Sequence, residues 1–552
     1  MEKSVELQTL DEEVLYHRGK HLVSDSKVAG DFDRDKYDLA RAGKKQVLKR
    51  RFGLVSMTGL SCGLMCTWES LLVVFGIGFQ NGGPAGLVYG FFLIWLGNIS
   101  VFIVIGELSS AIPTAGGQYH WVSILAPRSS RKFFSYITGW LTVIGWIAAL
   151  TSVSFFVADL TLQLVKLNSD FIKTGWQGTL LLWASLLLCV IINIFISGAL
   201  PAIEVVILII HVLGFFGILI PLVYLTPSHN SAKDVFTTFN NYGGWSSNAL
   251  ALFIGLQGNA LAFVGTDSAV HMSEEVKNAS TDVARSMLLS LVINGCLALG
   301  MLFAVLFSVP MDKIMIILTE SSGFPVIQIF QEAVGSKAGA TIMTSIIIIL
   351  EFCSALGCLA AASRMTWSFA RDRGLPFAQY IKLIDERTTI PVIAILVVTV
   401  CSGLLALINI GNNVAFNGTI SLVLEGFYIS YLLAIGLLLW RRLRGNMKSP
   451  EPIASFSSAS NSDEERNMAL QWGPWRLKGA WGVANNVLAC SYLMLLIFFS
   501  FWPNYLNVSD PTLMNWAVLV TGFIMIFSIG YYLLWARKTY TGPIVEVDSH
   551  GM

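Results

Sequence analysis

Twelve apolar stretches, each of about twenty residues, make up most of this 552-residue chain and limit its fold more than any other feature. A helix of that length is long enough to cross the hydrocarbon core of a bilayer. Charged residues make up only 13% of the chain, against about a quarter in soluble domains. The sequence therefore predicts an all-α integral membrane protein with 12 transmembrane helices, at 53–79, 85–111, 133–163, 177–197, 202–225, 248–272, 285–309, 338–368, 391–410, 415–440, 480–502 and 514–536.

The Lys and Arg residues are distributed unequally between alternate loops. One side of the predicted membrane carries 31 of the 36, and the other side carries Lys166, Lys173, Lys233, Lys313 and Lys337. Because Lys and Arg are enriched in cytoplasmic loops, we expect both termini in the cytoplasm. The predicted organisation is a largely disordered tail at 1–51, a twelve-helix domain at 52–537 that includes a Ser-rich cytoplasmic loop at 441–479, and a second tail at 538–552.

The predicted N-terminal tail ends in a basic run from Lys44 to Arg51. A basic segment beside a membrane attracts anionic headgroups, which makes membrane lipid a predicted partner of this run. The alternative is that the run only sets the topology of the first span.

Small residues interrupt two of the twelve stretches, the first and the sixth. The first interruption is Gly59-Leu60-Ser61-Cys62-Gly63, and the second is Gly265-Thr266-Asp267-Ser268-Ala269. A helix at bilayer depth gives up backbone hydrogen bonds only where protein or a solvated cavity supplies new partners. Paired interrupted helices, one in each half of a chain, are typical of the binding site of a secondary transporter. We therefore predict a transporter whose substrate site lies between these two segments.

The first interruption is predicted to hold part of the substrate. Ten to twelve helical residues after Arg51 reach about 15–18 Å, so the interruption lies near the bilayer midplane. Gly59 and Gly63 let a ligand approach the backbone, and the half-helix that follows Ser61 and Cys62 presents free N–H groups to a carboxylate. The alternative is that Gly59 and Gly63 form a small-xxx-small packing contact between helices.

The second interruption contributes Gly265, Thr266 and Asp267 to the predicted substrate site. An acidic residue at this depth marks a functional site by default, because an unpaired charge is costly in a bilayer. Phe263, just before the interruption, is predicted to form an aromatic lid over the substrate, with plain core packing as the alternative.

Asp267 also begins a row of titratable residues. His271 and Glu275 follow it at four-residue steps, so the three share one helix face that extends about 12 Å toward the cytoplasmic surface. Since histidine titrates near neutral pH, the row is a candidate path for a proton or cation. The alternative is that Glu275 marks the membrane interface and His271 is a buried structural side chain.

Four further acidic residues lie within predicted spans, and each must be paired, protonated or facing a cavity. Glu69, beyond the first interruption, is a further coupling candidate, and together with Glu425 it is a candidate contact for a cationic amine. The other two are Glu204, on span five with His211, and Glu351, on span eight.

Four stretches resemble the amino acid–polyamine–organocation (APC) superfamily, and most of all its fungal amino acid, GABA and choline permeases. Gly106–Tyr119 is similar to the signature after span two, and Phe263–Asn278 to the signature of span six. Ser363–Pro376 is similar to the loop after span eight. The fourth stretch is the interrupted first span, which ends near 67–69. The resemblance covers residues from about 50 to 540.

This resemblance implies a five-plus-five inverted repeat, of the LeuT type, with discontinuous helices 1 and 6 and two trailing helices. It implies alternating access, with a substrate carboxylate at the first interruption and the second completing the pocket, and it implies proton-coupled symport or exchange. Span five contains no lysine, so the coupling mechanism of bacterial relatives that carry one there is not implied.

The predicted function is therefore a permease for a small amine-bearing solute, an amino acid or GABA. We expect no enzyme activity, cofactor, metal site or nucleic-acid partner, because the histidines near the membrane are far apart and the eight cysteines have no metal-ligand spacing. The alternatives are a choline or polyamine transporter of the same fold and a nutrient sensor that has lost transport. The expected location is the plasma membrane, with the vacuolar membrane as the alternative.

Overall fold

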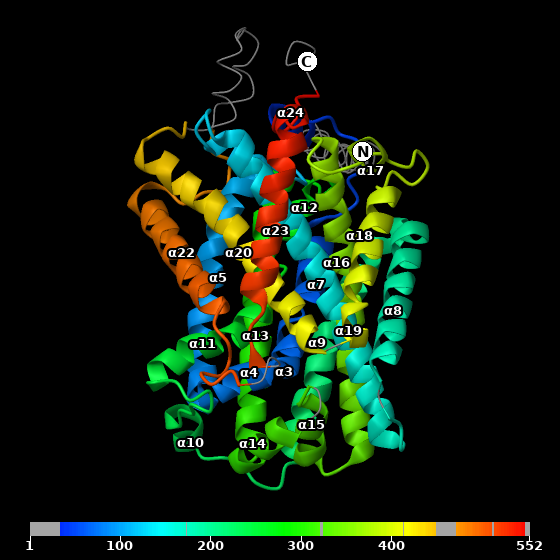
Figure 1. The fold of residues 1–552 in the computed structure, drawn as a ribbon, viewed down its shortest axis with the longest axis vertical. Helices are drawn as coiled ribbons and strands as arrows, with labels where there is room; N and C mark the ends of the chain where they lie inside the picture. Colours follow the sequence, from blue (N-terminus) through cyan, green and yellow to red (C-terminus); the bar gives the residue numbers. More distant parts are fainter. Residues whose placement is uncertain are drawn as a thin grey trace, which may run out of the picture.

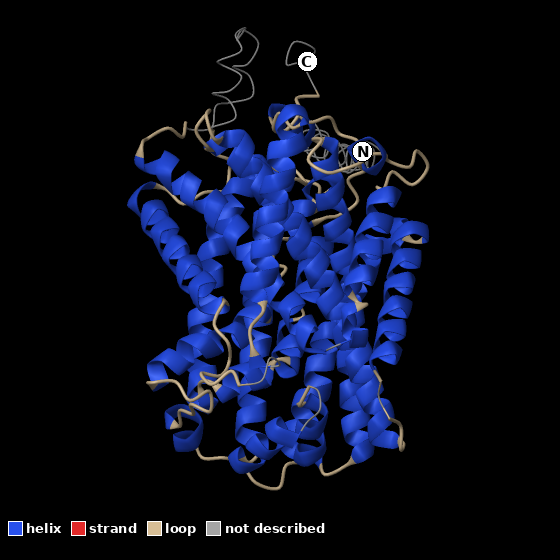
Figure 2. Cartoon of the chain, viewed as in Figure 1, coloured by secondary structure: helices blue, strands red, loops and turns tan. Residues whose placement is uncertain are grey.

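The computed structural model describes residues 34–172, 174–320, 324–411, 413–448, 471–509 and 513–546. Within these ranges the chain forms helices and loops, with two isolated β-bridges and no strand (Figure 2). Residues 1–33 of the predicted N-terminal tail and residues 449–470 of the predicted Ser-rich loop lie outside the described residues.

Ten segments in the described part of the chain are long and apolar enough to cross a membrane. Short elements extend three of these segments. The 3-10 turn η1 (Ser197–Ala199) precedes α9 (Leu200–Tyr224), and α19 (Ile408–Gly411) follows α18 (Val392–Leu405). The π-helix η5 (Tyr532–Ala536) and α24 (Arg537–Thr539) follow α23 (Ala517–Tyr531). The main helices of the ten are α5 (Gly83–Ala111), α7 (Arg131–Asn168), α8 (Gly175–Phe195), α9 (Leu200–Tyr224), α13 (Ala279–Ser308), α16 (Lys337–Arg371), α18 (Val392–Leu405), α20 (Asn413–Leu443), α22 (Gly479–Ser500) and α23 (Ala517–Tyr531).

Two more segments are interrupted helices, and they complete the twelve predicted spans. The first comprises α2 (Leu54–Met65), α3 (Thr67–Val73) and α4 (Phe75–Gln80). The second comprises α11 (Asn248–Leu261), α12 (Ser268–His271) and the 3-10 turn η2 (Ser273–Glu275). The prediction of an all-α protein with discontinuous first and sixth spans is confirmed. The two interruptions are five spans apart, as an internal repeat of five helices requires.

The position predicted for the first interruption is wrong. Helix α2 runs without a break through Gly59–Gly63, and the chain leaves the helix only at Cys66, which has φ 45° and ψ 46°. Glycines within an apolar helix also serve close packing, and tertiary contacts decide between packing and a break. Here the packing alternative holds for Gly59 and Gly63, as their contacts with α9 show below.

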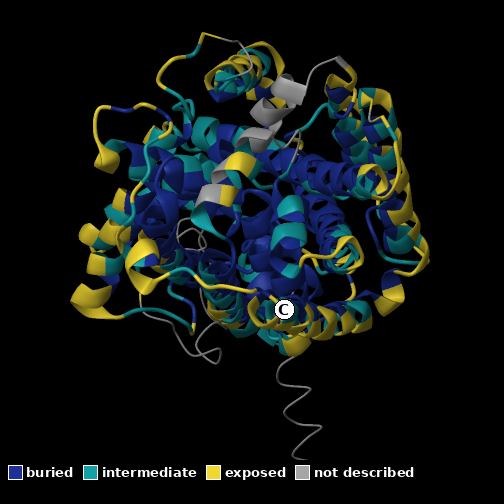
Figure 3. Cartoon of the chain, turned by 90° about the horizontal axis from the view of Figure 1, so that it is seen from below, coloured by how far each residue is buried: buried dark blue, intermediate teal, exposed yellow. Residues whose placement is uncertain are grey.

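The helices differ in burial, with an inner group that is more buried than the outer group. Helix α7 packs against α16 and α20, while α13 packs against α2 and α5. The most apolar 18-residue stretch of α7 is 72% buried, whereas that of α23 is 22% buried. Viewed along the bundle, buried residues occupy the centre and exposed residues the rim (Figure 3). The exposed rim is apolar, as expected where lipid rather than water is the solvent.

Both described chain ends lie at one end of the bundle, which we call the tail face (Figure 1). Residues 34–52 and 540–546 meet there, since the Glu546 amide donates to the Gly43 carbonyl at 2.8 Å. The opposite end is called the loop face. Short helices that the prediction of spans did not include cover both faces: α6 (Gln118–Leu125) and α17 (Ala378–Ile381) at the tail face, and α10 (Ala232–Thr237), α14 (Met311–Glu320) and α15 (Val326–Val334) at the loop face.

Local sequence explains where several of these helices begin. The Ser247 hydroxyl accepts from the Leu250 amide at the start of α11, and the Ser336 hydroxyl accepts from the Gly339 amide at the start of α16. Both are side-chain N-caps of the usual kind. The start of α13 is capped from a distance, because the Asp35 carboxylate accepts from the amides of Asn278 and Ala279. This cap attaches the N-terminal segment to the bundle.

Candidate functional site

The two helix interruptions pack against each other at the centre of the bundle. Gly265 has φ +93°, and a Cβ atom built on it would lie 2.3 Å from Cδ2 of Leu64. The Thr266 hydroxyl lies 3.7 Å from the sulfur of Met65, the last residue of α2. Glycine at residue 265 therefore serves both a left-handed backbone and a close approach between the two interrupted spans.

A small cavity of about 50 Å³ lies beside these interruptions. It is bounded by the end of α2, by α3, by Gly265 and by faces of α7 and α16. The lining is mainly apolar, with Trp146 and Phe156 as its aromatic side chains and the hydroxyls of Ser70, Ser152 and Ser354 as polar groups. This volume suits a few water molecules, so a larger ligand requires the surrounding helices to separate.

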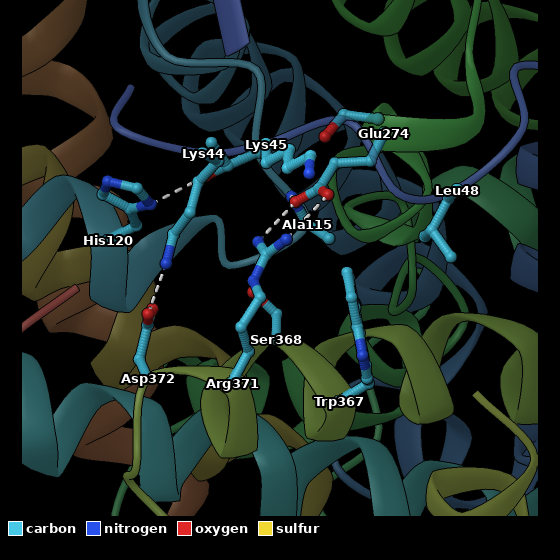
Figure 4. A network of polar contacts seen from close by, with 12 residues as sticks. Lys44, Lys45, Leu48, Ala115, His120, Glu274, Trp367, Ser368, Arg371 and Asp372 are labelled. Carbon is cyan, nitrogen blue, oxygen red and sulfur yellow. Dashed lines mark hydrogen bonds and ion pairs between the residues drawn. The ribbon is translucent and has the colours of Figure 1, made fainter. Parts of the chain in front are cut away.

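The cavity has a neighbouring cavity on the side of the loop face and buried ion pairs on the side of the tail face. A larger cavity of about 380 Å³ adjoins it, and the two share Val74 and Leu261 in their walls. On the tail side, the turn η2 forms two buried ion pairs with α16. Arg371 contacts both carboxylate oxygens of Glu274 at 2.7 and 3.0 Å, and Nε of Arg364 lies 2.7 Å from Glu275. Figure 4 shows the first pair together with the Ala115 amide, which also donates to Glu274.

The N-terminal segment completes this closure. Nζ of Lys44 pairs with the Asp372 carboxylate, and both side chains are fully buried (Figure 4). The Tyr119 hydroxyl and the Ile544 amide donate to the same carboxylate at 2.8 and 2.9 Å. Burial alone would raise the pKa of Asp372, but the charges of Lys44 and Arg371 hold it below its usual value. The carboxylate is therefore ionised and joins both tails to α16.

These contacts exclude two members of the basic run from the predicted contact with lipid, and lipid stays a predicted partner of the exposed members. Lys44 is 1% exposed, and the Arg50 side chain lies between the Asp35 carboxylate and the carbonyls of Ser273 and Val276. Neither side chain is available to a headgroup, because each is enclosed by protein partners. Lys45 and Lys49 of the run are exposed.

Asp267 lies beside His271, as their spacing predicts. Oδ2 of Asp267 is 3.3 Å from Nε2 of His271 and accepts from the Gln118 amide at 2.8 Å. Nδ1 of His271 lies 2.9 Å from the Ala115 carbonyl, and the Trp146 ring meets the imidazole edge-on at 5.6 Å. Oδ1 of Asp267 has no hydrogen-bond partner among the described residues.

This geometry determines how many protons the pair holds. The Ala115 carbonyl can only accept, so Nδ1 of His271 carries a hydrogen. A hydrogen bond between Nε2 and the Asp267 carboxyl then needs one more proton, placed either on the imidazole or on the carboxyl. In this geometry the two side chains share one proton beside the interruption of the sixth span.

Glu275 does not continue this row. It pairs with Arg364 rather than contacting His271, and its backbone carbonyl accepts from the amides of Arg51 and Phe52. The third member of the predicted path thus holds the tail face closed, because a cation from α16 faces it.

The remaining predicted site residues of the two interruptions are buried, but none of them lines the cavity. A Cβ atom on Gly59 would lie 2.4 Å from the Glu204 carbonyl oxygen, and one on Gly63 would lie 2.6 Å from Cγ2 of Ile207, so both glycines pack against α9. The Phe263 ring packs on Phe91 of α5 at 5.4 Å, in the manner of a core side chain. The last two are Ser61, which is fully buried, and Cys62, whose carbonyl accepts from the amide of Cys66 and the side chain of Asn294.

The acidic residues elsewhere in the spans have different surroundings. Glu69 pairs with His211 across α3 and α9 at 2.7 Å, and Glu351 accepts from the Ser70 hydroxyl at 3.1 Å. In the described part of the chain, Oε1 of Glu204 and both carboxyl oxygens of Glu425 have no hydrogen-bond partner.

Sequence reasoning missed Gln118, Arg364 and Arg371 as functional residues. Each lies in one of the stretches that carry the family resemblance, and the structure brings those stretches together at the tail face. The available signal was charge: the third stretch contains three arginines, and the second contains two adjacent glutamates.

Comparisons with known proteins agree with this architecture. A choline transporter of Saccharomyces cerevisiae is 28% identical over 92% of this chain and 85% of its own length. A GABA-specific permease of the same yeast is 27% identical over 93% of this chain and 86% of its own length. The amino-acid permease BAT1 of Arabidopsis thaliana is 26% identical over 93% of this chain and 96% of its own length. Since the amino acid permease family model also matches residues 52–525, this chain belongs to that family of membrane transporters within the APC superfamily.

Proposed function

We propose that this permease moves an amino acid or GABA across the membrane by alternating access, coupled to protons. The observation that carries the proposal is the central cavity beside the two helix interruptions, which has a larger cavity next to it toward one face and buried ion pairs toward the other. An arrangement of this kind describes one of the two access states that a secondary transporter needs.

The chemistry of the cavity supports a small amine-bearing solute. Trp146 and Phe156 supply aromatic faces, which attract an amine or ammonium group. Helix termini at Cys66 and Asp267 interrupt the backbone beside the cavity, so main-chain polar groups are close to any ligand there. Gly265, Thr266 and Asp267 remain the proposed substrate contacts from the sixth span. On the first span, the proposed contact moves from 59–63 to the end of α2 at Leu64 and Met65.

Proton coupling rests on Asp267 and His271, which share one proton. Tyr431 of α20 and Cys358 of α16 are close enough to interact electrostatically with Asp267, while Gln118 and Trp146 contact the pair directly. Within the residues that the structure covers, His271 is the basic side chain that pairs with Asp267. Binding or loss of the proton therefore changes the charge beside the substrate cavity by one unit, which is how occupancy of the two sites becomes linked.

We further propose that the tail face is cytoplasmic and that the protein resides in the plasma membrane. The excess of Lys and Arg on the side of the tails supports this orientation. The vacuolar membrane is the alternative location. An epitope tag at each terminus tests the orientation, since both tags must be inaccessible to antibody in intact cells.

The experiment that tests the function is uptake of radiolabelled GABA, a panel of neutral amino acids, choline and a polyamine into transporter-deficient yeast at pH 5 and pH 7.5. We expect uptake of a carboxylated solute that rises at pH 5 and is abolished by a protonophore. Uptake of choline or the polyamine alone would contradict the amino acid assignment and favour the alternative cargo. A correctly localised protein that transports nothing would favour the nutrient sensor.

Substitutions in the cavity wall and at Asp267 test where the cargo binds and how its transport is coupled to protons. Ala149→Leu adds a larger side chain to the cavity wall on α7 and is expected to abolish uptake. The matched control is Ala184→Leu, the same change on an exposed position of α8, which is expected to retain uptake. Asp267→Asn removes the titratable carboxyl and is expected to remove the stimulation by low pH. Retention of proton-driven accumulation in Asp267→Asn would overturn the coupling role of the pair.

A further inference from the structure

A second buried pair of His and carboxylate lies on the first interrupted span. Nδ1 of His211 on α9 is 2.7 Å from Oε1 of Glu69 on α3, and both side chains are fully buried. The Trp68 ring lies 5.8 Å from the imidazole and shields it on one side. The mechanism proposed above does not use these residues.

Asn294 of α13 determines the protonation of this pair. Its side-chain amide donates to the Cys62 carbonyl at 3.1 Å and to the Thr67 hydroxyl at 3.2 Å. Because a carbonyl only accepts, the amide nitrogen must face Cys62, and Oδ1 of Asn294 faces Nε2 of His211 at 3.0 Å. Nε2 therefore carries a hydrogen. The hydrogen bond between Nδ1 and Glu69 then needs one additional proton, shared by the imidazole and the carboxyl.

The surroundings favour retention of this proton in the observed conformation. The titratable groups near Glu69 are the Glu351 carboxyl and the thiols of Cys62, Cys66 and Cys353, and none of them supplies a positive charge. Loss of the proton would leave a net negative charge on a buried pair, which is unfavourable without a compensating cation.

Loss of the proton would also disturb the helix interruption itself. A neutral imidazole has one N–H, so it cannot donate to both Glu69 and Asn294. If the hydrogen moves to Nδ1, Asn294 must turn its amide to donate to Nε2. That rotation removes its hydrogen bond to the Cys62 carbonyl in α2, because a carbonyl cannot donate to the amide oxygen that then faces it.

We infer that Glu69, His211 and Asn294 form a proton-binding site that holds α2 and α3 in their present geometry and releases them when the proton leaves. The site is separate from the Asp267–His271 pair. Its part in transport rests on the proposed proton coupling, but its effect on the interruption does not require any particular cargo.

The test uses the thiol of Cys66, which is at the interruption and is 1% exposed. The full-length protein in lipid nanodiscs is treated with a small thiol reagent between pH 5 and pH 8, and labelling at each cysteine is measured by peptide mass spectrometry. The ratio of labelling at Cys66 to labelling at Cys490, a buried cysteine on α22, removes the general effect of pH on thiol reactivity. We expect the ratio to rise several-fold between pH 5 and pH 8 in the wild-type protein.

Glu69→Gln is the decisive variant. Glutamine donates to Nδ1 of a neutral His211, so every hydrogen bond of the site is retained without a titratable proton. We expect a ratio that stays low at every pH. Asn294→Asp removes the donor to Cys62 and is expected to give a high ratio throughout. If Glu69→Gln fails to fold, His211→Phe replaces it and is expected to give a ratio that does not change with pH.

A flat wild-type ratio, or a wild-type profile retained in Glu69→Gln or in His211→Phe, would overturn the inference. Asp267→Asn separates this site from the proposed function, because it is expected to keep the wild-type labelling profile. A steep labelling profile in a protein whose uptake ignores pH would contradict the proposed coupling and leave the proton site standing. Proton-driven uptake with a labelling profile that does not change with pH would contradict the proton site and leave the proposed coupling standing.

Discussion

Lys44 and Asp372 form a fully buried ion pair across 328 residues of sequence. The pair joins the segment before the first span to the end of α16, and the Ile544 backbone contacts both members. A buried charge that loses its partner is strongly destabilising, whereas loss of both charges together costs much less. The closed tail face therefore depends on a specific long-range partnership.

Lys44→Met tests this partnership. It leaves the Asp372 carboxylate buried without its cation, so we expect a loss of about 3–5 kcal/mol in the free energy of unfolding. The double variant Lys44→Met with Asp372→Asn is expected to recover a large part of that loss. Denaturant unfolding in detergent micelles measures both. Additive effects of the two substitutions would show that they do not interact.

We expect the folded protein to become less stable as the pH decreases, because His120 is buried in its neutral form. Burial, followed by the charge of Lys44, lowers the pKa of His120 from 6.5 to about 3 in the folded protein. Between those values the unfolded chain binds a proton that the folded chain does not, so stability decreases as pH falls below about 6.5. The slope approaches about 1.4 kcal/mol per pH unit for one such group.

His120→Gln removes the contribution of this imidazole to the pH dependence of stability. The glutamine side-chain oxygen can accept from the Thr114 hydroxyl, which lies 3.1 Å from Nδ1 in the wild-type protein. We expect a shallower dependence of unfolding free energy on pH between 6.5 and 4.5. Asp372 adds the same sign at lower pH, because its lowered pKa stabilises the folded state above about 4 and that stabilisation is lost in stronger acid. An unchanged slope in His120→Gln would assign the pH dependence to other groups.

Gly59 and Gly63 are expected to respond differently to substitution by alanine. The new Cβ of Gly59→Ala would meet the Glu204 backbone carbonyl, which cannot move alone, whereas that of Gly63→Ala would meet only the Cγ2 methyl of the Ile207 side chain. We expect Gly59→Ala to be the more destabilising, by about 1–3 kcal/mol or more. Ile207→Ala is expected to restore stability to Gly63→Ala and not to Gly59→Ala. Thermal unfolding of the purified variants provides the measurement.

The Glu274–Arg371 pair is expected to be essential for transport. Arg371→Lys keeps the charge but loses the two-point contact with the carboxylate, and we expect uptake to fall about tenfold with normal surface expression. The control is Arg285→Lys, which changes a 59% exposed side chain whose ion pair with Asp282 is 3.6 Å long. Exposed pairs contribute little, so this variant should transport normally. Equal losses in the two variants would argue against a gating role for Glu274 and Arg371.

The sequence alone determined the number, order and approximate limits of the membrane helices. This follows because each span requires about twenty apolar residues to cross a bilayer, and that requirement does not depend on tertiary contacts. The interruption of the sixth span was predictable for the same kind of local reason, since Gly265, Thr266 and Asp267 disfavour a continuous apolar helix. The contact between Asp267 and His271 followed from helical spacing.

Only the tertiary structure decided what the glycines and charges of each span contact. Gly59 and Gly63 allow a break or close packing equally well, and the proximity of α9 selects packing. The basic run before the first span was compatible with lipid, but the acidic partners of Lys44 and Arg50 were brought to it by folding. Glu69 and His211 likewise lie 142 residues apart in sequence and meet only in the folded bundle. Hydrophobic length is a property of a segment, whereas pairing is a property of two segments whose positions are set by the packing of all the others.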